Sequence, residues 1–323
     1  MTAMSEPSVK KRGSYLAEVL ANEVVCDDHG RLILDVAHFP PTAPGQFIQL
    51  MCRPPTPPEA GRAIEWRDGQ TPQFTQAELL DSQPLLRRPF SIAGRREHAG
   101  GASELDIVYC VKGVGTRWLA GVNAGQSLSV LGPLGNSFVI RRDKPAAALV
   151  GGGVGIPPLL YLAEQLATAG KETVAFIGAR SADRLPLRLL PNADVRTDGA
   201  PSHCAAELAA YGVETAIATD DGSLGMAGVV GEAFGKWLDG SAVSAENVVV
   251  YSCGPEAMME AVALMSLAAG AECQLSLERY MACGMGTCQS CVCKLRDDSA
   301  QGWAYKLCCA DGPVFDAAQI VWD

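Results

Sequence analysis

The hydrophobic pattern of this chain changes at about residue 145, and that change constrains the fold more than any other feature. Before it, short runs such as SYLAEVLANEVVC (14–26) and QSLSVLGP (126–133) alternate polar and apolar residues between turns. Such runs predict an antiparallel β-barrel or sandwich. After it, AAALV (146–150) precedes a glycine-rich turn and a stretch with apolar residues at helical spacing, and the pattern recurs. Strands that alternate with helices predict a parallel α/β sheet.

The same change sets the expected organisation of the 323-residue chain, which is long enough for two or three domains. We expect an N-terminal tail (1–13), an antiparallel barrel (14–142), an α/β domain (143–270) and a small C-terminal segment (271–323). A stretch rich in proline and polar residues, at about 53–84, predicts an insertion in the barrel. We expect it to be mostly loop, with one short helix near 76–80.

Composition and charge narrow the classes of function. The formal charge is −10 and no basic patch is present, which disfavours nucleic acid and anionic membrane as partners. No apolar run approaches the roughly 20 residues of a membrane span, and the N-terminus lacks the apolar region of a signal peptide. Twelve cysteines without an export signal indicate a reducing compartment, the cytoplasm. There, metal or cluster ligation is favoured over disulfides.

Five cysteines near the C-terminus suggest an iron–sulfur site. Cys283, Cys288 and Cys291 have the C-x4-C-x2-C spacing of plant-type [2Fe–2S] sites, whose fourth thiolate comes from farther along the chain. Cys308 and Cys309 are the candidates for that fourth ligand. The alternative is zinc held by four cysteines. Zinc usually takes two short cysteine knuckles, whereas only one C-x2-C occurs here.

The residues around these cysteines fit a cluster loop. Gly284 and Gly286 allow positive φ and bring backbone N–H groups toward the sulfurs, where hydrogen bonds tune the reduction potential. Cys293 follows in CVCKL, a strand-like run that leaves the loop. We expect Cys293 to be a buried thiol and not a ligand.

The stretch RRPFSIAG (87–94) is a candidate flavin strand. Arg88 offers a planar fork to a pyrophosphate, Phe90 a surface to a ring, and Ser91 a hydroxyl to a ring nitrogen. The plainer interpretation is an edge strand with a surface arginine. Farther on, VKGVGTRWLAGV (111–122) has glycines and a threonine before an expected short helix, which makes it a weaker phosphate-binding candidate.

The turn GGGVGIPP (151–158) follows a buried strand and opens a helix, so its N–H groups can meet a pyrophosphate. It departs from the Rossmann fingerprint because Ile156 takes the place of the third glycine, and a plain strand-to-helix turn is the alternative. Arg180 and Arg184 follow the next strand, where arginine can meet the 2′-phosphate of NADP. The choice between NAD and NADP stays open at this point.

Together these motifs resemble a known superfamily. The R-P-F-S strand, the later G-x-G-T, the GGGVGIPP turn and CGPEAMM are similar to ferredoxin–NADP reductases. The C-terminal C-x4-C-x2-C, followed by CADGPVF, resembles the electron-transfer subunits of type B dihydroorotate dehydrogenases. The resemblance covers residues 14–321, less the insertion.

The resemblance implies sites for three cofactors. FAD is implied at Arg88, Pro89, Phe90 and Ser91, with Val108, Tyr109, Cys110, Gly115 and Thr116. NAD is implied at Gly151, Gly152, Gly153 and Gly155, with Cys253, Gly254 and Pro255. The implied [2Fe–2S] ligands are Cys283, Cys288, Cys291 and Cys309.

The resemblance also implies a function in pyrimidine (UMP) synthesis. Electrons pass from dihydroorotate, through FMN on a separate catalytic subunit, then through the cluster and FAD, to NAD. This chain has no room for a catalytic barrel of about 250 residues, so we expect a partner subunit and no catalytic residue here. The alternatives are a reductase subunit of a hydrogenase, sulfide-active or oxygenase complex, and a redox sensor without turnover.

Overall fold

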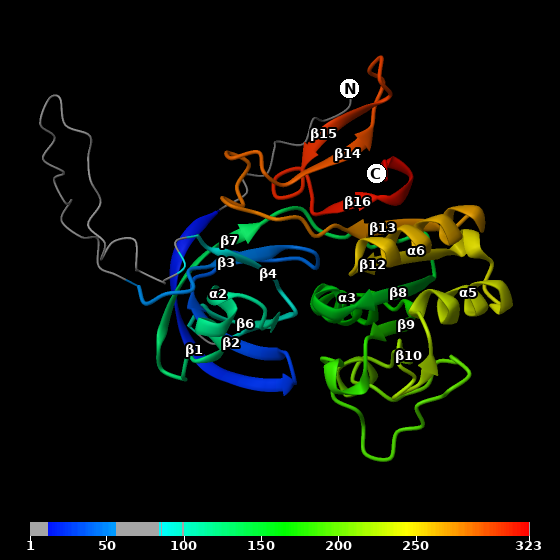
Figure 1. Cartoon of the computed structure of the whole chain (residues 1–323), viewed down its shortest axis with the longest axis horizontal. Helices are drawn as coiled ribbons and strands as arrows, with labels where there is room; N and C mark the ends of the chain where they lie inside the picture. The colour runs from blue at the N-terminus through cyan, green and yellow to red at the C-terminus, as the bar shows by residue number, and fades with distance from the viewer. Residues whose placement is uncertain (1–11, 56–83, 85, 99, 323) are drawn as a thin grey trace, which may run out of the picture.

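The computed structural model describes residues 12–55, 84, 86–98 and 100–322. Most of the predicted tail and insertion, including the helix predicted near 76–80, lies outside these residues. Within them the chain forms two seven-stranded sheets and one two-stranded sheet (Figure 1). No helix among the described residues is both long and apolar enough to cross a membrane.

The first sheet is antiparallel and curls on itself, in the order β4-β3-β7-β1-β2-β6-β5. Its elements are β1 (Gly13–Cys26), β2 (His29–Ala37), β3 (Phe47–Leu50), β4 (Arg88–Ser91), β5 (Gly94–Glu97), β6 (Ala102–Cys110), the helix α2 (Val114–Ala120) and β7 (Ser127–Leu134). Alternate side chains such as Leu32, Leu34 and Ile107 fill its interior. Edge strand β4 approaches β6, where the Phe90 and Tyr109 ring centroids are 6.2 Å apart. The antiparallel barrel is confirmed, in the form of a curled sheet.

The second sheet has the order β11-β10-β9-β8-β12-β13-β16 and is parallel except for β16. Its elements are β8 (Ala146–Gly152), η1 (Gly153–Gly155), α3 (Ile156–Thr168), β9 (Glu172–Ala179), η2 (Ala182–Arg184), α4 (Ala206–Ala209), β10 (Glu214–Thr219), β11 (Met226–Ala227), α5 (Val230–Gly240), η3 (Ala245–Asn247), β12 (Val248–Cys253), α6 (Glu256–Ala268) and β13 (Glu272–Ser276). This sheet confirms the predicted α/β architecture.

Helices cover both faces of the second sheet. Along β8, Ala147 and Leu149 face α3, whereas Ala148 and Val150 face α5 and α6. Helix α3 lies between this sheet and the curled sheet (Figure 1). There the Tyr161 hydroxyl donates a hydrogen bond to the Thr42 carbonyl at 3.0 Å. The helix therefore joins the two sheets.

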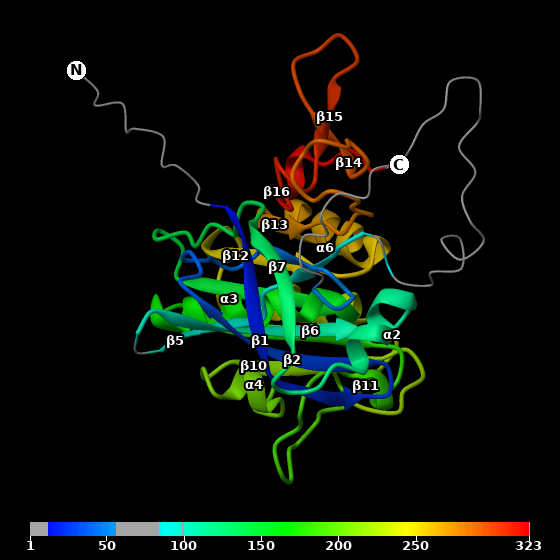
Figure 2. The same ribbon diagram turned by 90° about the vertical axis from the view of Figure 1, so that its left-hand side faces the viewer.

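The C-terminal segment lies over both sheets (Figures 1 and 2). It contains β14 (Val292–Arg296) and β15 (Trp303–Leu307), which pair as a hairpin, then β16 (Val314–Asp316) and η4 (Ala317–Gln319). Strand β16 pairs antiparallel with β13, so the segment contributes a strand to the edge of the second sheet.

Asn136, just after β7, fastens this segment to the curled sheet. Its Nδ2 donates hydrogen bonds to the carbonyls of Asp311 at 3.1 Å and Val314 at 2.8 Å. Its Oδ1 accepts one from the Val314 N–H at 2.9 Å. One side chain thus satisfies three backbone groups on either side of Gly312 and Pro313.

We expect Asn136→Ala to lower the free energy of unfolding by about 1–3 kcal/mol, because several backbone groups lose their partner. Urea denaturation of the purified chain measures this loss. The exposed side chain of Asn123, in the loop before β7, forms no hydrogen bond of this kind within the described part of the chain, so Asn123→Ala is the matched control. Equal stability of the two variants would contradict the role of Asn136.

Candidate functional site

The cluster loop, residues 278–291, folds around the thiol of Cys283. The backbone N–H groups of Met285 and Cys288 donate to the Cys283 sulfur at 3.5 and 3.4 Å. Gly284 and Gly286 have φ of +69° and +93°, in the left-handed region that favours glycine. The two glycines therefore let the loop curl back on its first cysteine.

The other two cysteines of the motif differ in exposure. Cys291 is buried, whereas Cys288 is exposed. Hydrogen bonds from Ser290 lower the pKa of the Cys288 thiol to about 6, which favours the thiolate form that ligates metals. The exposed cysteine of the motif is therefore one whose surroundings favour the thiolate.

Cys309 lies with these cysteines and Cys308 does not. The Cys309 N–H donates to the Cys291 sulfur at 3.4 Å, and the Cys309 thiol lies near Cys283 and the Gly286 backbone. Burial raises the pKa of Cys309 to about 12. The Cys308 thiol is fully buried and instead donates to the Leu277 carbonyl at 3.1 Å.

Cys293 is separate from this group as well. It is buried, its thiol donates to the Lys306 carbonyl at 3.5 Å across the β14–β15 hairpin, and burial raises its pKa to about 11. The donor set of Cys283, Cys288, Cys291 and Cys309, around a loop with inward N–H groups, fits a thiolate-ligated iron–sulfur cluster.

The flavin strand β4 brings Arg88 against the helix α2. A Cβ added to Gly115 would lie 3.4 Å from the Arg88 Cγ and Nε atoms, so the arginine side chain covers this glycine. The Arg88 guanidinium donates to the carbonyl of Leu86 at 2.8 Å and forms no ion pair with a residue that the structure describes. Its neighbour Arg87 is instead committed to β7, donating to the Ser129 carbonyl at 2.7 Å. The two arginines therefore have different contacts: Arg87 binds β7, whereas Arg88 lies over Gly115.

Helix α2 begins at Val114, so Gly115 and Thr116 lie inside it and not before it as predicted. The Thr116 hydroxyl accepts hydrogen bonds from the N–H groups of Lys112 at 2.9 Å and Gly113 at 3.1 Å. These hydrogen bonds satisfy the N–H groups just before α2, so the helix begins before Gly115. Gly115 thus lies directly under Arg88, and a side chain at position 115 would crowd the arginine.

The β6 residues divide between the two faces of their strand. Tyr109 is buried, and its ring lies over Gly30, where an added Cβ would be 2.5 Å from it. Val108 and Cys110 point to the other face. Cys110 lies beside Asp28, and burial raises its pKa. Tyr109 therefore supports Phe90 from the interior of the curled sheet, while Val108 and Cys110, also buried, lie on the opposite face of the strand.

The predicted nucleotide residues converge. Strand β12 pairs with β8 so that Cys253 lies opposite Gly151. A Cβ on Gly155 would fall 2.1 Å from the Cys253 carbonyl oxygen, and one on Gly152 would be 3.3 Å from Pro255. Only glycines allow the two turns to touch this closely. The resulting backbone surface at the start of α3 suits a pyrophosphate.

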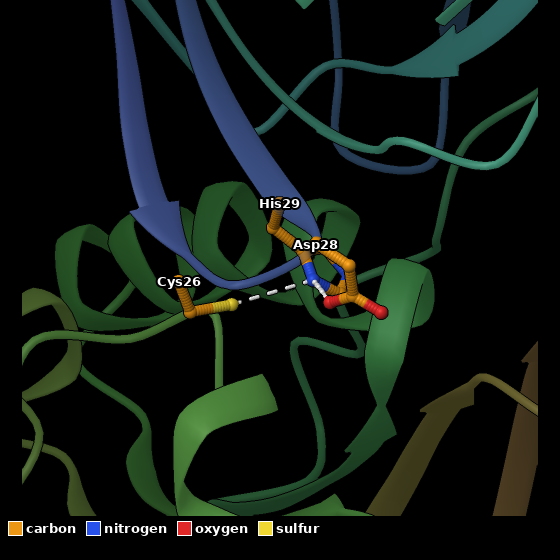
Figure 3. A group of neighbouring side chains, drawn as sticks. All are labelled: Cys26, Asp28 and His29. Carbon is orange, nitrogen blue, oxygen red and sulfur yellow. Dashed lines mark hydrogen bonds and ion pairs between the residues drawn. The ribbon is translucent and has the colours of Figure 1, made fainter. Parts of the chain in front are cut away.

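Three side chains at the β1–β2 turn contact one another, and this turn lies against the α/β domain. The His29 Nδ1 atom is 2.7 Å from an Asp28 oxygen and 3.4 Å from the Cys26 sulfur (Figure 3). Burial lowers the pKa of His29, which favours the neutral ring that donates Nδ1–H to Asp28. The second Asp28 oxygen pairs with Arg184 at 3.3 Å. Both Arg180 and Arg184 are exposed, and Arg184 is paired with Asp28.

Asn22 belongs to none of the sequence motifs, yet it holds elements of the candidate flavin site together. Its Nδ2 donates to the carbonyls of Leu119 and Val122, both at 2.9 Å, and its Oδ1 accepts from the Tyr109 hydroxyl at 2.8 Å. Asn22 thus fixes the end of α2 to β1 and β6. The available signal was an asparagine in mid-strand, where that residue type is uncommon.

Comparisons with known proteins agree with this geometry. The family described as "Iron-sulfur cluster binding domain of dihydroorotate dehydrogenase B" matches residues 278–321. The dihydroorotate dehydrogenase B (NAD(+)) electron transfer subunit of Caldanaerobacter subterraneus subsp. tengcongensis is 34% identical over 261 residues, 80% of this chain and 91% of that protein. Its counterpart from Geobacillus thermodenitrificans is 40% identical over 255 residues, 78% and 86% of the two chains.

Solved structures show the same fold. A chain of an NADH-dependent reduced ferredoxin–NADP oxidoreductase superposes with a TM-score of 0.68 at 23% identity, covering 99% of this chain and 92% of that one. Phthalate dioxygenase reductase superposes with a TM-score of 0.52 at 16% identity, covering 92% and 77%. At these identities the likeness concerns the fold alone.

We expect Cys309→Ser to lose the cluster and Cys308→Ser largely to keep it, because only the Cys309 thiol faces the other three. A serine at 308 retains a hydroxyl donor for the Leu277 carbonyl, so the two variants are well matched. Iron and acid-labile sulfide analysis of both proteins, purified without oxygen, makes the comparison. Equal loss in the two variants would leave Cys309 without its assigned role.

We expect Arg88→Ala to weaken FAD binding by roughly 1.5–3 kcal/mol, through loss of a charge-assisted bidentate contact. Flavin retained after dialysis gives the measurement. Arg96→Ala is the control, since Arg96 is exposed on β5 and paired with Glu104. Unchanged flavin content in the Arg88 variant would show that Arg88 is only a surface charge.

Proposed function

This chain belongs to the family of dihydroorotate dehydrogenase B electron transfer subunits, and on that premise we propose that it carries electrons from an FMN-containing catalytic subunit to NAD. It is an oxidoreductase subunit with FAD, a [2Fe–2S] cluster and NAD as cofactors, and the substrate chemistry takes place on its partner. FAD supplies the exchange between hydride and single electrons, and the cluster supplies one-electron transfer. The residues of this chain hold and order these groups.

The observation that carries the proposal is the position of the cluster segment against the strand next to the flavin strand. Strand β3 pairs with β4, the strand that carries Arg88. Phe47 on β3 packs into the same core as Cys291 and Cys309. The segment proposed to hold the cluster and the strand proposed to hold the flavin thus both contact β3. Their closeness suits the passage of single electrons between the two cofactors.

The proposed ligand assignments follow from placement. Cys283, Cys288, Cys291 and Cys309 would hold the cluster. Arg88 above Gly115 would hold the FAD pyrophosphate, with Phe90 and Ser91 toward the flavin ring. The paired backbone turns at Gly155 and Cys253 would receive the NAD pyrophosphate. The remaining predicted residues of each set lie on the same strands and turns.

The surface around the cluster loop supports a partner there. Within the cluster loop, Tyr280 is 97% exposed and Met285 47%, and Cys288 of the same loop is exposed as well. Exposed aromatic and methionine side chains are enriched in protein interfaces. We propose that the catalytic subunit docks on this apolar surface, which brings its FMN toward the exposed side of the cluster.

NAD is proposed in preference to NADP. Arg184 follows the second strand of the nucleotide sheet, where a 2′-phosphate would be received. Its guanidinium is already paired with Asp28, which His29 holds in turn. This pairing neutralises part of the positive charge that would otherwise attract the 2′-phosphate of NADP.

We expect the isolated chain to reduce ferricyanide with NADH and to show no dihydroorotate oxidation. Activity with dihydroorotate and NAD should appear only when an FMN-containing catalytic subunit is added, because hydride transfer needs direct contact between substrate and flavin. Assays with and without that subunit test the proposal. Full activity from the chain alone would refute it, and no activity with any such subunit would point to a hydrogenase- or sulfur-type complex.

We expect NADH to be preferred over NADPH in the ferricyanide assay, and Asp28→Asn to narrow the difference by freeing Arg184. The KM for NADPH should fall several-fold while the KM for NADH stays constant. Asp27→Asn is the control, because Asp27 is exposed beside Asp28. If the KM for NADPH in Asp28→Asn equals that of the unaltered chain, Arg184 does not lie at the 2′ position.

A further inference from the structure

Gln49 is a buried polar residue that neither the sequence motifs nor the family comparison assigns to a role. It lies in β3, between Pro89 on β4 and Leu131 on β7, and is 1% exposed. Its Nε2 group is buried without a hydrogen-bond partner among the described residues. Such a donor costs about 1–3 kcal/mol when it is left unpaired, so its position calls for a partner.

The Gln49 side chain points away from the interior of the curled sheet. Ile48 and Leu50 belong to that interior core, whereas Phe47 belongs to the core that contains Cys291 and Cys309. Alternate residues of a strand share a face, so Gln49 projects with Phe47 toward the C-terminal segment. A polar residue thus occupies a position where the segment covers the strand.

The amide meets the cluster loop at Gly284. A Cβ added to Gly284 would lie 2.1 Å from the Gln49 Nε2 atom and 2.6 Å from its Cδ, so the amide fills the space that a side chain would take. Gly284 directly follows Cys283, whose sulfur already accepts two backbone N–H groups of this loop. The unpaired donor therefore lies against the segment that would surround the cluster sulfurs.

We propose that the Gln49 amide donates a hydrogen bond to a sulfur of the [2Fe–2S] site and thereby raises the cluster's reduction potential. Hydrogen bonds to cluster sulfurs stabilise the reduced, more negative state. Gln49 is then a positioning residue that links the strand beside the flavin to the cluster. The inference rests on the proposed function, since it needs the cluster to be bound at these cysteines.

The first test compares midpoint potentials in EPR-monitored redox titrations. Gln49→Met keeps the length of the side chain and removes the donor, so the cluster potential should shift to a more negative value while the flavin potential stays constant. Gln46→Met is the control, because the Gln46 amide donates to the Gly135 carbonyl at 3.2 Å, away from the cluster loop. A purely structural role for Gln49 would lower stability and leave the potential unchanged.

The second test detects the hydrogen bond directly in the unaltered chain, and its control variant is read only after iron analysis shows that it holds the cluster. With glutamine labelled by ¹⁵N in the side-chain amide, pulsed EPR of the reduced unaltered chain should show a weak ¹⁵N coupling. Gln289 also lies in the cluster loop, on its exposed side, so the coupling should persist in Gln289→Met. Absence of the coupling, or its loss in Gln289→Met, overturns the inference.

The outcomes separate this inference from the function on which it rests. An unaltered chain without two irons and two labile sulfides refutes the proposed function, and the inference with it. A [2Fe–2S] cluster with the same potential in the unaltered chain and in Gln49→Met refutes the inference alone.

Discussion

The packing of the C-terminal segment against the outer face of β3 is the contact on which the rest of the arrangement depends. It packs Phe47 into the same hydrophobic core as Cys291 and Cys309, and it brings Gln49 against Gly284. Because β3 pairs with the flavin strand β4, one short strand of four residues separates the two proposed redox sites. Asn136, which follows β7, also fastens the C-terminal segment to the curled sheet, through three hydrogen bonds.

The fold class could be predicted from the sequence because its signals are local. Alternating runs gave the curled sheet, and AAALV before GGGVGIPP gave a strand, a turn and a helix that begins at Ile156. The start of α2 was predicted too late because Thr116 caps the preceding N–H groups from inside the first turn.

The site could be predicted only as far as its motifs extend along the chain. Spacing located Cys283, Cys288 and Cys291 but left Cys308 and Cys309 open, and only the family resemblance of CADGPVF favoured Cys309. In the structure the two adjacent side chains point in different directions. That direction depends on the backbone between β15 and β16, which Asn136 holds from far away in sequence. Three residues of the site, Asn22, Asp28 and Gln49, belong to no sequence motif. Each has a partner more than 80 residues away in sequence, which becomes a neighbour only when the chain folds.

The pairing of β16 with β13 has a consequence for biogenesis. The cluster loop lies between these two strands in sequence, and β16 follows Cys309. During synthesis Cys283, Cys288 and Cys291 therefore emerge before Cys309, and Cys309 emerges before the strand that fastens it. All the other strands of the second sheet precede Cys283 in the chain. The proposed ligand set is thus complete only after those strands have been synthesised.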